Sequence, residues 1–273
     1  MSDPAYIEAV EGWRRERANN LSSPHGWLSA AVLFWLQPGQ NWMGSASSNL
    51  IRLPQGTAPD CAGSFQLEGE EIFLTTCGDA RLSIGEHMTS HERITIQKES
   101  SLAIVLNDLE LYVIRRGARY GVRIFNPGNP AIRDFAGLSW FPIDESLRIT
   151  ARYIPLPKPQ TMKVVNVLGD TEEVPFPGVV DFTLAGRSCQ FDPVLQEDGL
   201  LWFMFRDRTN GALTYPAGRY LKAAADQDGS VELDFNKAYN PPCAYTEFAT
   251  CPLPPPKNRL DIPVLAGEKK FPK

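Results

Sequence analysis

The sequence lacks the short motifs that identify the common hydrolases, nucleotide-binding proteins and metalloproteins. It contains no Gly-x-Ser-x-Gly elbow, no Walker loop, no His-Glu-x-x-His and no Cys-x-x-Cys pair, and each absence excludes the class that the motif marks. Histidine is also scarce, with three residues in the chain. His87 and His91 could share a metal ion if their segment were helical, but the segment is typical of a solvated turn before a strand. We therefore expect no bound metal and no cofactor.

Long apolar runs and a surplus of basic residues are absent as well. No stretch approaches a membrane span, and the first twenty residues contain acidic side chains without the apolar core of a secretory signal. The net charge of −5 does not attract nucleic acids or anionic membranes. These absences predict a cytoplasmic protein whose partners are small molecules or proteins, with no nucleic acid and no membrane among them.

Cysteine is present in an odd number, with five residues at positions 61, 77, 189, 243 and 251. Without a secretory signal, this number favours reduced thiols over a closed disulfide framework. Cys243 and Cys251 each adjoin a proline and have no histidine nearby. We interpret them as buried structural thiols. The alternatives are a bond between them, a metal site that borrows Cys61 and Cys77, or a nucleophile.

The N-terminal forty residues carry the helical signals of the chain. Apolar residues at Tyr6, Val10 and Trp13 follow helical spacing, and Pro4 suits a first turn, so we predict an amphipathic helix over residues 4–20. The apolar decamer 27–36 is too short to cross a bilayer and stops before Pro38-Gly39; it predicts a second, short buried helix. Residues 1–40 are therefore interpreted as a helical cap.

From residue 63 onward the pattern changes to short alternating runs between turn residues, which is typical of antiparallel β proteins. The predicted strands are 64–67, 71–76, 81–84, 93–97, 102–106, 110–116, 119–125, 148–154, 162–168, 179–185, 188–191, 200–206, 219–223 and 231–235. The fold class that we predict is mainly β, either a sandwich or a partly open barrel, with the N-terminal helical cap. Prolines between 155 and 177 mark a potential boundary, but we expect a single domain over residues 1–273, with a β body at 60–236.

The C-terminal segment 237–273 is rich in proline and aromatic residues. Prolines at 241, 242, 252, 254, 255 and 256 remove backbone donors and fix φ, which excludes a helix or a central strand. Phe235, Tyr239, Tyr245 and Phe248 provide apolar surface that a disordered tail would lack. We predict an extended belt that docks on the β body; a PxxP peptide ligand is the alternative.

Several stretches of the chain resemble one family. They are Gly26-Trp27-Leu28, Trp140 to Asp144, Phe205 to Tyr220, Asp234-Phe235-Asn236, Ala238 to Cys243, Cys251 to Pro255, Asn258-Arg259-Leu260 and Gly267-Glu268. Together they closely resemble the signature of a bacterial and archaeal family known as domain of unknown function 1684. Because no activity is established for that family, the resemblance implies where a site could lie but not its chemistry.

Two arginines are the candidates for a ligand site. Arg123 and Arg219 could present guanidinium groups to an anion, since a guanidinium captures carboxylates and phosphates with two parallel bonds. Alternatively, Asp207 and Asp234 neutralise the two arginines in structural ion pairs, and the Asn210-Gly211 turn signal explains the loop before Arg219. The remaining candidates are Asp207, Asp234 and Tyr215 for acid/base catalysis and Asn236, Tyr239 and Asn240 for ligand binding.

Two functional hypotheses follow. The first is a pocket for a small anionic metabolite, which is bound or hydrolysed without a metal. The second is a non-catalytic domain that makes a protein contact or a homodimer through its belt and aromatic loops. A cleft in which both arginines converge without ion-pair partners would favour the first hypothesis, and an exposed apolar face would favour the second.

Overall fold

The structure is a computed structural model that describes residues 3–97 and 100–272, without the side chain of Pro159. The chain divides into two compact units. Unit 1 consists of residues 1–19 and 136–273, and unit 2 consists of residues 20–135. The single domain predicted from the sequence stays a prediction.

Helix α1, Pro4–Leu21, confirms the predicted N-terminal helix. Its first turn is capped by Asp3, whose Oδ1 accepts a hydrogen bond from the Ala5 N–H at 3.0 Å. Tyr6 and Val10 are buried, so the helix contributes its apolar stripe to unit 1.

The prediction of a second, short helix over residues 27–36 is wrong. After a single 3-10 turn, η1 (Trp27–Ser29), the apolar run forms strand β1, Ala30–Trp35. β1 pairs antiparallel with β13, Arg119–Phe125, with Leu33 opposite Arg123. A continuous apolar run has neither helical nor strand period, so its partner in the fold decides its conformation.

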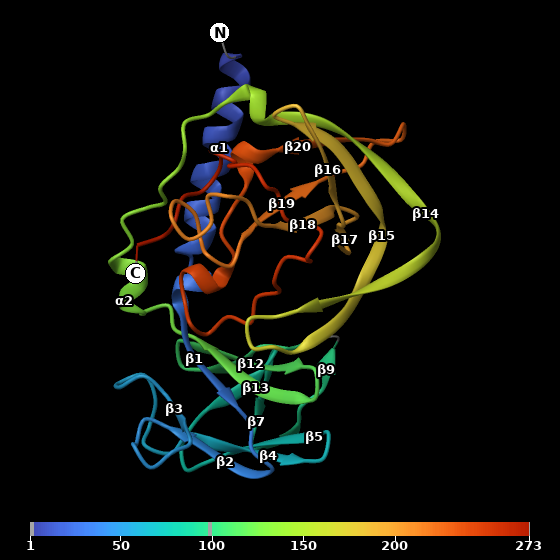
Figure 1. Cartoon of the computed structure of the whole chain (residues 1–273). Helices are drawn as coiled ribbons and strands as arrows, with labels where there is room; N and C mark the ends of the chain where they lie inside the picture. The colour runs from blue at the N-terminus through green and yellow to red at the C-terminus, as the bar shows by residue number, and fades with distance from the viewer. Residues whose placement is uncertain (1–2, 98–99, 273) are drawn as a thin grey trace. The chain divides into compact units, whose positions relative to one another are not determined.

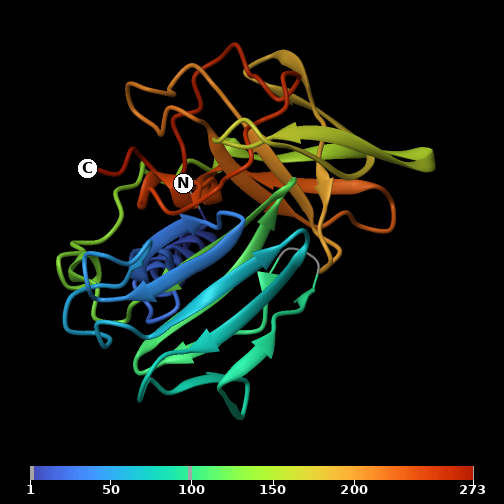
Figure 2. The same ribbon diagram turned by 90° about the horizontal axis from the view of Figure 1, so that it is seen from below.

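Unit 2 contains two antiparallel sheets around one core (Figure 2). In the described ranges one sheet has the order β1-β13-β12-β11-β6-β7, with β10 beside β12 and β9 beside β10, and the other has the order β3-β2-β4-β5-β8. Their bounds are β2 Gly39–Gly44, β3 Ile51–Arg52, β4 Gly63–Glu68, β5 Glu71–Thr76, β6 Leu82–Ile84, β7 His87–Thr89, β8 His91–Arg93, β9 Ile96–Gln97, β10 Ser100–Ser101, β11 Ile104–Leu106 and β12 Leu109–Arg116. Phe65 and Leu74 from one sheet join Ile104 and Val122 from the other in a single buried cluster, as in a β-sandwich. The unit ends with the short helix α2, Pro130–Arg133.

Unit 1 contains two further antiparallel sheets and helix α1. The described strands are ordered β16-β15-β14-β20 and β17-β18-β19. Their bounds are β14 Arg148–Val165, β15 Thr171–Leu184, β16 Arg187–Phe191, β17 Val194–Leu195, β18 Leu201–Phe205, β19 Arg219–Ala223 and β20 Ser230–Asp234. Short 3-10 turns stand at Glu145–Leu147 (η2), Phe235–Lys237 (η3) and Pro242–Ala244 (η4). The mainly-β class is thus confirmed, and no sheet of the described residues closes into a barrel.

Strands β14 and β15 form one long curved hairpin (Figure 1). Their register shifts between Pro155 and Gln160, so the intervening residues bulge. The prolines at which the sequence analysis placed a potential boundary therefore lie within a continuous hairpin of unit 1.

The segment 237–273 docks within unit 1, as its apolar residues predict. Leu260, Ile262, Val264 and Ala266 are buried in the same core cluster as the strands of unit 1. Apart from η4, its described residues have no regular helix or strand. Side-chain burial therefore holds the belt in place, together with single backbone bridges such as Tyr220 to Tyr239.

The prediction that all five cysteines are reduced is wrong for Cys61 and Cys77, which form a disulfide. Strands β4 and β5 pair Gly63 with Thr76, and this register brings the residues just beyond the pair together. Cys189, Cys243 and Cys251 carry thiols.

The described residues offer no membrane-spanning helix, since none is both long and apolar enough. Nor do they bring together three or more His, Cys, Asp or Glu side chains that could hold a metal ion. His87 lies on β7 and His91 on β8, in different sheets, so they do not form the helical pair considered above.

Candidate functional site

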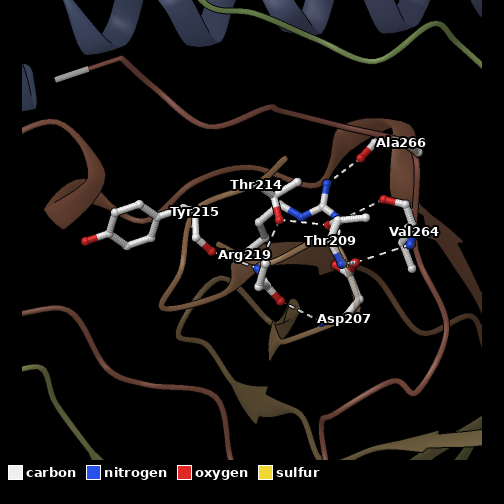
Figure 3. A network of polar contacts seen from close by, with 8 residues as sticks. Asp207, Thr209, Thr214, Tyr215, Arg219, Val264 and Ala266 are labelled. Atoms are coloured by element: carbon white, nitrogen blue, oxygen red, sulfur yellow. Dashed lines mark hydrogen bonds and ion pairs between the residues drawn. The ribbon is translucent and has the colours of Figure 1, made fainter. Parts of the chain in front are cut away.

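Arg219 lies at the centre of a buried polar network in unit 1 (Figure 3). Its guanidinium is fully buried and donates to Asp207 Oδ2 at 2.8 Å, to the Val264 carbonyl at 3.0 Å and to the Ala266 carbonyl. Burial lowers the pKa of this guanidinium, and Asp207 opposes the shift. Asp207 is thus a buried ion-pair partner of the arginine, while the arginine Nε has no hydrogen-bond partner among the described residues.

The neighbouring glycine explains how the arginine reaches this position. Gly218 has φ +110°, and a Cβ there would lie 2.6 Å from the Phe205 carbonyl oxygen. Only glycine fits such a backbone conformation at such a close approach. The chain can therefore turn sharply into β19 and direct Arg219 inward.

The loop before Arg219 is held by its own side chains. Asp207 Oδ1 accepts from the N–H groups of Thr209 at 2.8 Å and Val264 at 3.2 Å, and the hydroxyls of Thr209 and Thr214 lie 2.8 Å apart. The ring of Tyr215 points away from the guanidinium in Figure 3, and its hydroxyl donates to the Cys243 carbonyl at 2.9 Å. Asp207 and Tyr215 are thus not directed at a common ligand position.

Asp234 and Asn236 form a second, separate cluster with helix α1. The Tyr6 hydroxyl donates to Asp234 Oδ1 at 2.8 Å and accepts from Asn236 Nδ2 at 2.9 Å. Burial, together with the bond to Asp234, raises the pKa of Tyr6. The hydrogen bonds of this cluster connect the first turns of α1 to the end of β20.

Asn240 and Tyr239 belong to a third cluster, which is centred on the buried carboxylate of Glu268. Glu268 accepts from Arg17 Nε at 3.1 Å, from the Asn240 backbone N–H at 3.1 Å, from Asn240 Nδ2 at 2.8 Å and from the Tyr245 hydroxyl. The guanidinium of Arg17 also lies 4.2 Å from the centre of the Tyr239 ring. The charge of Glu268 is therefore neutralised and hydrogen-bonded within the fold.

Arg123 lies in unit 2 and not with Arg219. It is buried on β13, and its guanidinium lies 5.0 Å from the centre of the Trp27 ring. The residues predicted as one site are therefore distributed over three clusters of unit 1 and one strand of unit 2.

Unit 2 has a hollow that sequence analysis did not identify. Its volume is about 1040 Å³, which is large enough for a small ligand. The walls come from four segments of unit 2: residues 54–57, the β11–β12 turn, the loop after β13, and His25.

Glu110 is the central acceptor of the hollow. Its Oε2 lies 2.9 Å from the Tyr112 hydroxyl, which donates to it, and 3.0 Å from His25 Nδ1. Since a carboxylate can only accept, Nδ1 of His25 carries the proton and Nε2 is left as an acceptor in the neutral ring. Burial and Glu110 together raise the pKa of Tyr112 to about 12, so its hydroxyl stays a donor to the carboxylate.

Asn126 contributes a donor to the same hollow. The residue is 9% exposed, and its Oδ1 accepts from the Gly128 N–H at 2.9 Å, which orients the amide. Among the described residues its Nδ2 has no partner. This Nδ2 is not among the buried side-chain atoms that lack a partner, so it reaches solvent in the hollow, where it can donate to a ligand acceptor.

These residues escaped sequence analysis because they are far apart in the chain. His25, Glu110 and Asn126 follow no motif, and each alone looks like an ordinary surface or turn residue. Asn126-Pro127-Gly128 is a turn-like sequence, but nothing local indicates that its amide lines a hollow.

Comparisons with known proteins find similarity to an uncharacterised family and to an uncharacterised protein. The model of a family described as "Protein of unknown function (DUF1684)" matches residues 133–269. An uncharacterized protein from Haloarcula marismortui, solved in solution, is 34% identical to this chain, with a TM-score of 0.43. The matched region covers 51% of this chain and 80% of the Haloarcula chain. The FHA domain of FhaA, solved in complex with the intracellular domain of Rv3910, is 13% identical and covers 34% of this chain and 94% of its own, with a TM-score of 0.25. No curated protein matches the chain.

Proposed function

The chain belongs to the DUF1684 family of proteins of unknown function, and we propose that it binds a small, neutral, hydroxyl-rich molecule in the hollow of unit 2. The observation that carries the proposal is the lining of the hollow, which combines the amide of Asn126, oriented by the Gly128 N–H, with the carboxylates of Asp108 and Glu110. The family model does not cover this hollow, so the proposal concerns this chain and not the family as a whole.

Hydroxyl groups match this lining because each one both donates and accepts. Glu110 and Asp108 offer acceptor oxygens, and Asn126 offers a donor. The ring faces of Pro54 and Pro127 add apolar wall, which suits the C–H faces of a sugar or polyol. A few fixed polar groups on a partly apolar wall are typical of small-molecule sites.

The charge of the lining disfavours the anionic metabolite that the arginines suggested. None of the described lining residues is lysine or arginine, whereas Asp108 and Glu110 are acidic. An anion would be repelled there. Arg219, the other candidate for anion binding, is enclosed by Asp207 and two carbonyls, so the proposal gives Asp207, Arg219 and Tyr215 structural roles.

Ligand screening with a matched pair of variants tests the proposal. The probes are neutral monosaccharides and polyols, with alkyl amines and carboxylates of similar size as the comparison, and binding is followed by calorimetry and thermal shift. Asn126→Asp keeps the acceptor for the Gly128 N–H but removes the vacant donor, so it should weaken binding of the neutral probe roughly tenfold, the size of one lost hydrogen bond. Gln227→Glu makes the same charge change at an exposed position of unit 1 and should leave binding unchanged.

Three outcomes would contradict the proposal. The first is that no neutral hydroxylated probe binds the intact chain, and the second is that Asn126→Asp binds the probe as well as the parent chain does. The third is that amines bind more tightly than all neutral probes, which would make the hollow a cation site.

A protein contact is the second candidate function. The end of the β14–β15 hairpin exposes the apolar side chains of Val165, Val167 and Leu168, and exposed apolar clusters are common at interfaces. Replacing all three by serine should lower self-association in sedimentation if this hairpin makes a homodimer. A parent chain that is monomeric at every concentration would exclude the homodimer.

The disulfide bears on where the protein works. Cysteine pairs such as Cys61–Cys77 persist in oxidising compartments and are rare in the cytoplasm. This supports an oxidising compartment over the cytoplasmic location expected from the sequence. Cell fractionation with thiol trapping would measure it, and a reduced Cys61–Cys77 pair in a cytoplasmic fraction would contradict it.

A further inference from the structure

Cys243 and Cys251 are in direct contact in the belt of unit 1. The backbone N–H of Cys243 donates to Sγ of Cys251 at 3.1 Å. Because the N–Cα bond is about 1.46 Å long, the Cα of Cys243 lies within roughly 4.6 Å of that sulfur. In a disulfide, the sulfur of one cysteine lies at about this distance from the Cα of the other.

The surroundings hold both cysteines in a defined place. Cys243 stands in the short 3-10 turn η4, after two prolines, and its carbonyl accepts from Tyr215. Pro252 follows Cys251, and its carbonyl accepts from the Tyr220 hydroxyl at 2.6 Å. Each backbone is therefore anchored by a hydrogen bond of its own, in addition to the direct contact between the two cysteines.

Burial separates this pair from the remaining thiol. Cys243 is 8% exposed and Cys251 is 4% exposed, while Cys189 is more accessible. Reagents of small size reach such a pair through local opening, whereas a protein partner does not.

We propose that Cys243 and Cys251 are a redox-modification site that forms an intramolecular disulfide by exchange with a low-molecular-weight disulfide. The bond would close the segment 243–251 into a loop across the belt. The inference is independent of the ligand proposed for unit 2, since the pair lies in unit 1.

The exchange proceeds in two balanced steps. First, the thiolate of Cys251, whose negative charge the Cys243 N–H stabilises, attacks one sulfur of the reagent. The reagent's S–S bond breaks, one thiolate leaves and takes up a proton, and a mixed disulfide stands on Cys251. Cys243 then loses its proton to solvent and attacks Sγ of Cys251, which releases the second reagent thiolate. The two protein thiols are oxidised, and one reagent disulfide is reduced to two thiols.

The experiment uses the full chain with Cys189→Ser, so that Cys243 and Cys251 are the remaining thiols beside the Cys61–Cys77 disulfide. The protein is incubated with oxidised glutathione, denatured in acid, alkylated and analysed by intact mass and by a non-reducing peptide map. We expect the number of alkylated thiols to fall from two to zero per chain, with no glutathione retained and a peptide that links Cys243 to Cys251.

The matched variants keep one thiol of the pair at a time. Cys243→Ser and Cys251→Ser, each with Cys189→Ser, should retain glutathione on the thiol that is left, since no partner can displace it. If a serine variant does not fold, the chain with Cys189 intact is mapped in the same way. The proposal is overturned if both thiols stay alkylatable after prolonged oxidation, if glutathione accumulates on the intact pair, or if either cysteine links to Cys61 or Cys77 instead.

Discussion

Replacing Arg219 by methionine tests whether the buried guanidinium stabilises unit 1 or serves a ligand. Methionine fills a similar volume without charge, so the change isolates the polar contacts. It leaves the buried carboxylate of Asp207 without its cation and the carbonyls of Val264 and Ala266 without their donor. Removing one partner of a buried ion pair costs about 3 to 5 kcal/mol, because the other charge stays buried and uncompensated.

The magnitude is large compared with the whole stability of a domain. Typical domains have a free energy of unfolding of about 5 to 15 kcal/mol, so Arg219→Met should remove roughly a fifth of it or more. Asp207→Ala should cost a similar amount, since it strands the guanidinium in the same place. The double variant should lose at least about 2 kcal/mol less than the sum of the two, because residues in one network are not additive.

Urea unfolding followed by tryptophan fluorescence measures these losses. Arg208→Ala is the matched control in the same loop: its partner Asp261 lies 3.0 Å away, and both side chains are more than half exposed, so the loss should stay below about 1 kcal/mol. A loss of that small size for Arg219→Met, or strict additivity with Asp207→Ala, would refute the reasoning.

Three further predictions concern other parts of the chain. The free energy of unfolding should fall as the pH rises from about 10 to about 12, because Tyr112, with its pKa raised to about 12, keeps its proton in the folded state while the unfolded chain loses it. Tyr112→Phe should flatten that decline in alkaline unfolding curves, and an unchanged slope would contradict the prediction. Reducing the Cys61–Cys77 disulfide, whose cysteines are 16 residues apart, should destabilise unit 2 by about 3 kcal/mol through chain entropy, measured by unfolding with and without reductant; equal midpoints would exclude it. Deleting residues 240–273 should prevent unit 1 from folding because it removes buried Leu260 and Val264, and a truncated chain with the parent melting temperature would contradict this.

Most of the strands could be predicted because their pattern is local. Residues 110–116 and 119–125 are β-rich runs on either side of Gly117, and β12 and β13 pair as a hairpin, as such a pattern predicts. The run Trp27 to Leu36 could not be assigned, since an unbroken apolar segment fits a helix and a strand equally well. Prolines such as Pro175 can lie within the β14–β15 hairpin because a strand at the edge of a hairpin does not need every backbone donor.

The sites depended on contacts that no local pattern contains. Arg219 beside a glycine suggested anion binding, but its acceptors at Val264 and Ala266 arrive from about 45 residues later in the chain. The structural alternative named Asp207 correctly because the two residues share one loop. The hollow of unit 2 was missed for the opposite reason, since Glu110 and His25 meet only through the fold.

The carboxylate of Glu268 has a consequence for the order in which the chain is made. Its bond to Arg17 connects the first helix with the last segment of unit 1, and the whole of unit 2 lies between them in sequence. At about 5 to 20 residues per second, a ribosome releases Glu268 roughly 12 to 50 s after Arg17. For most of that interval α1 lacks the later strands of unit 1 and the partners of Tyr6, Asp234 and Asn236, whereas unit 2 can complete its core from consecutive residues. The nascent helix is therefore the segment that a chaperone would have to shelter while the rest of its own unit is still being translated.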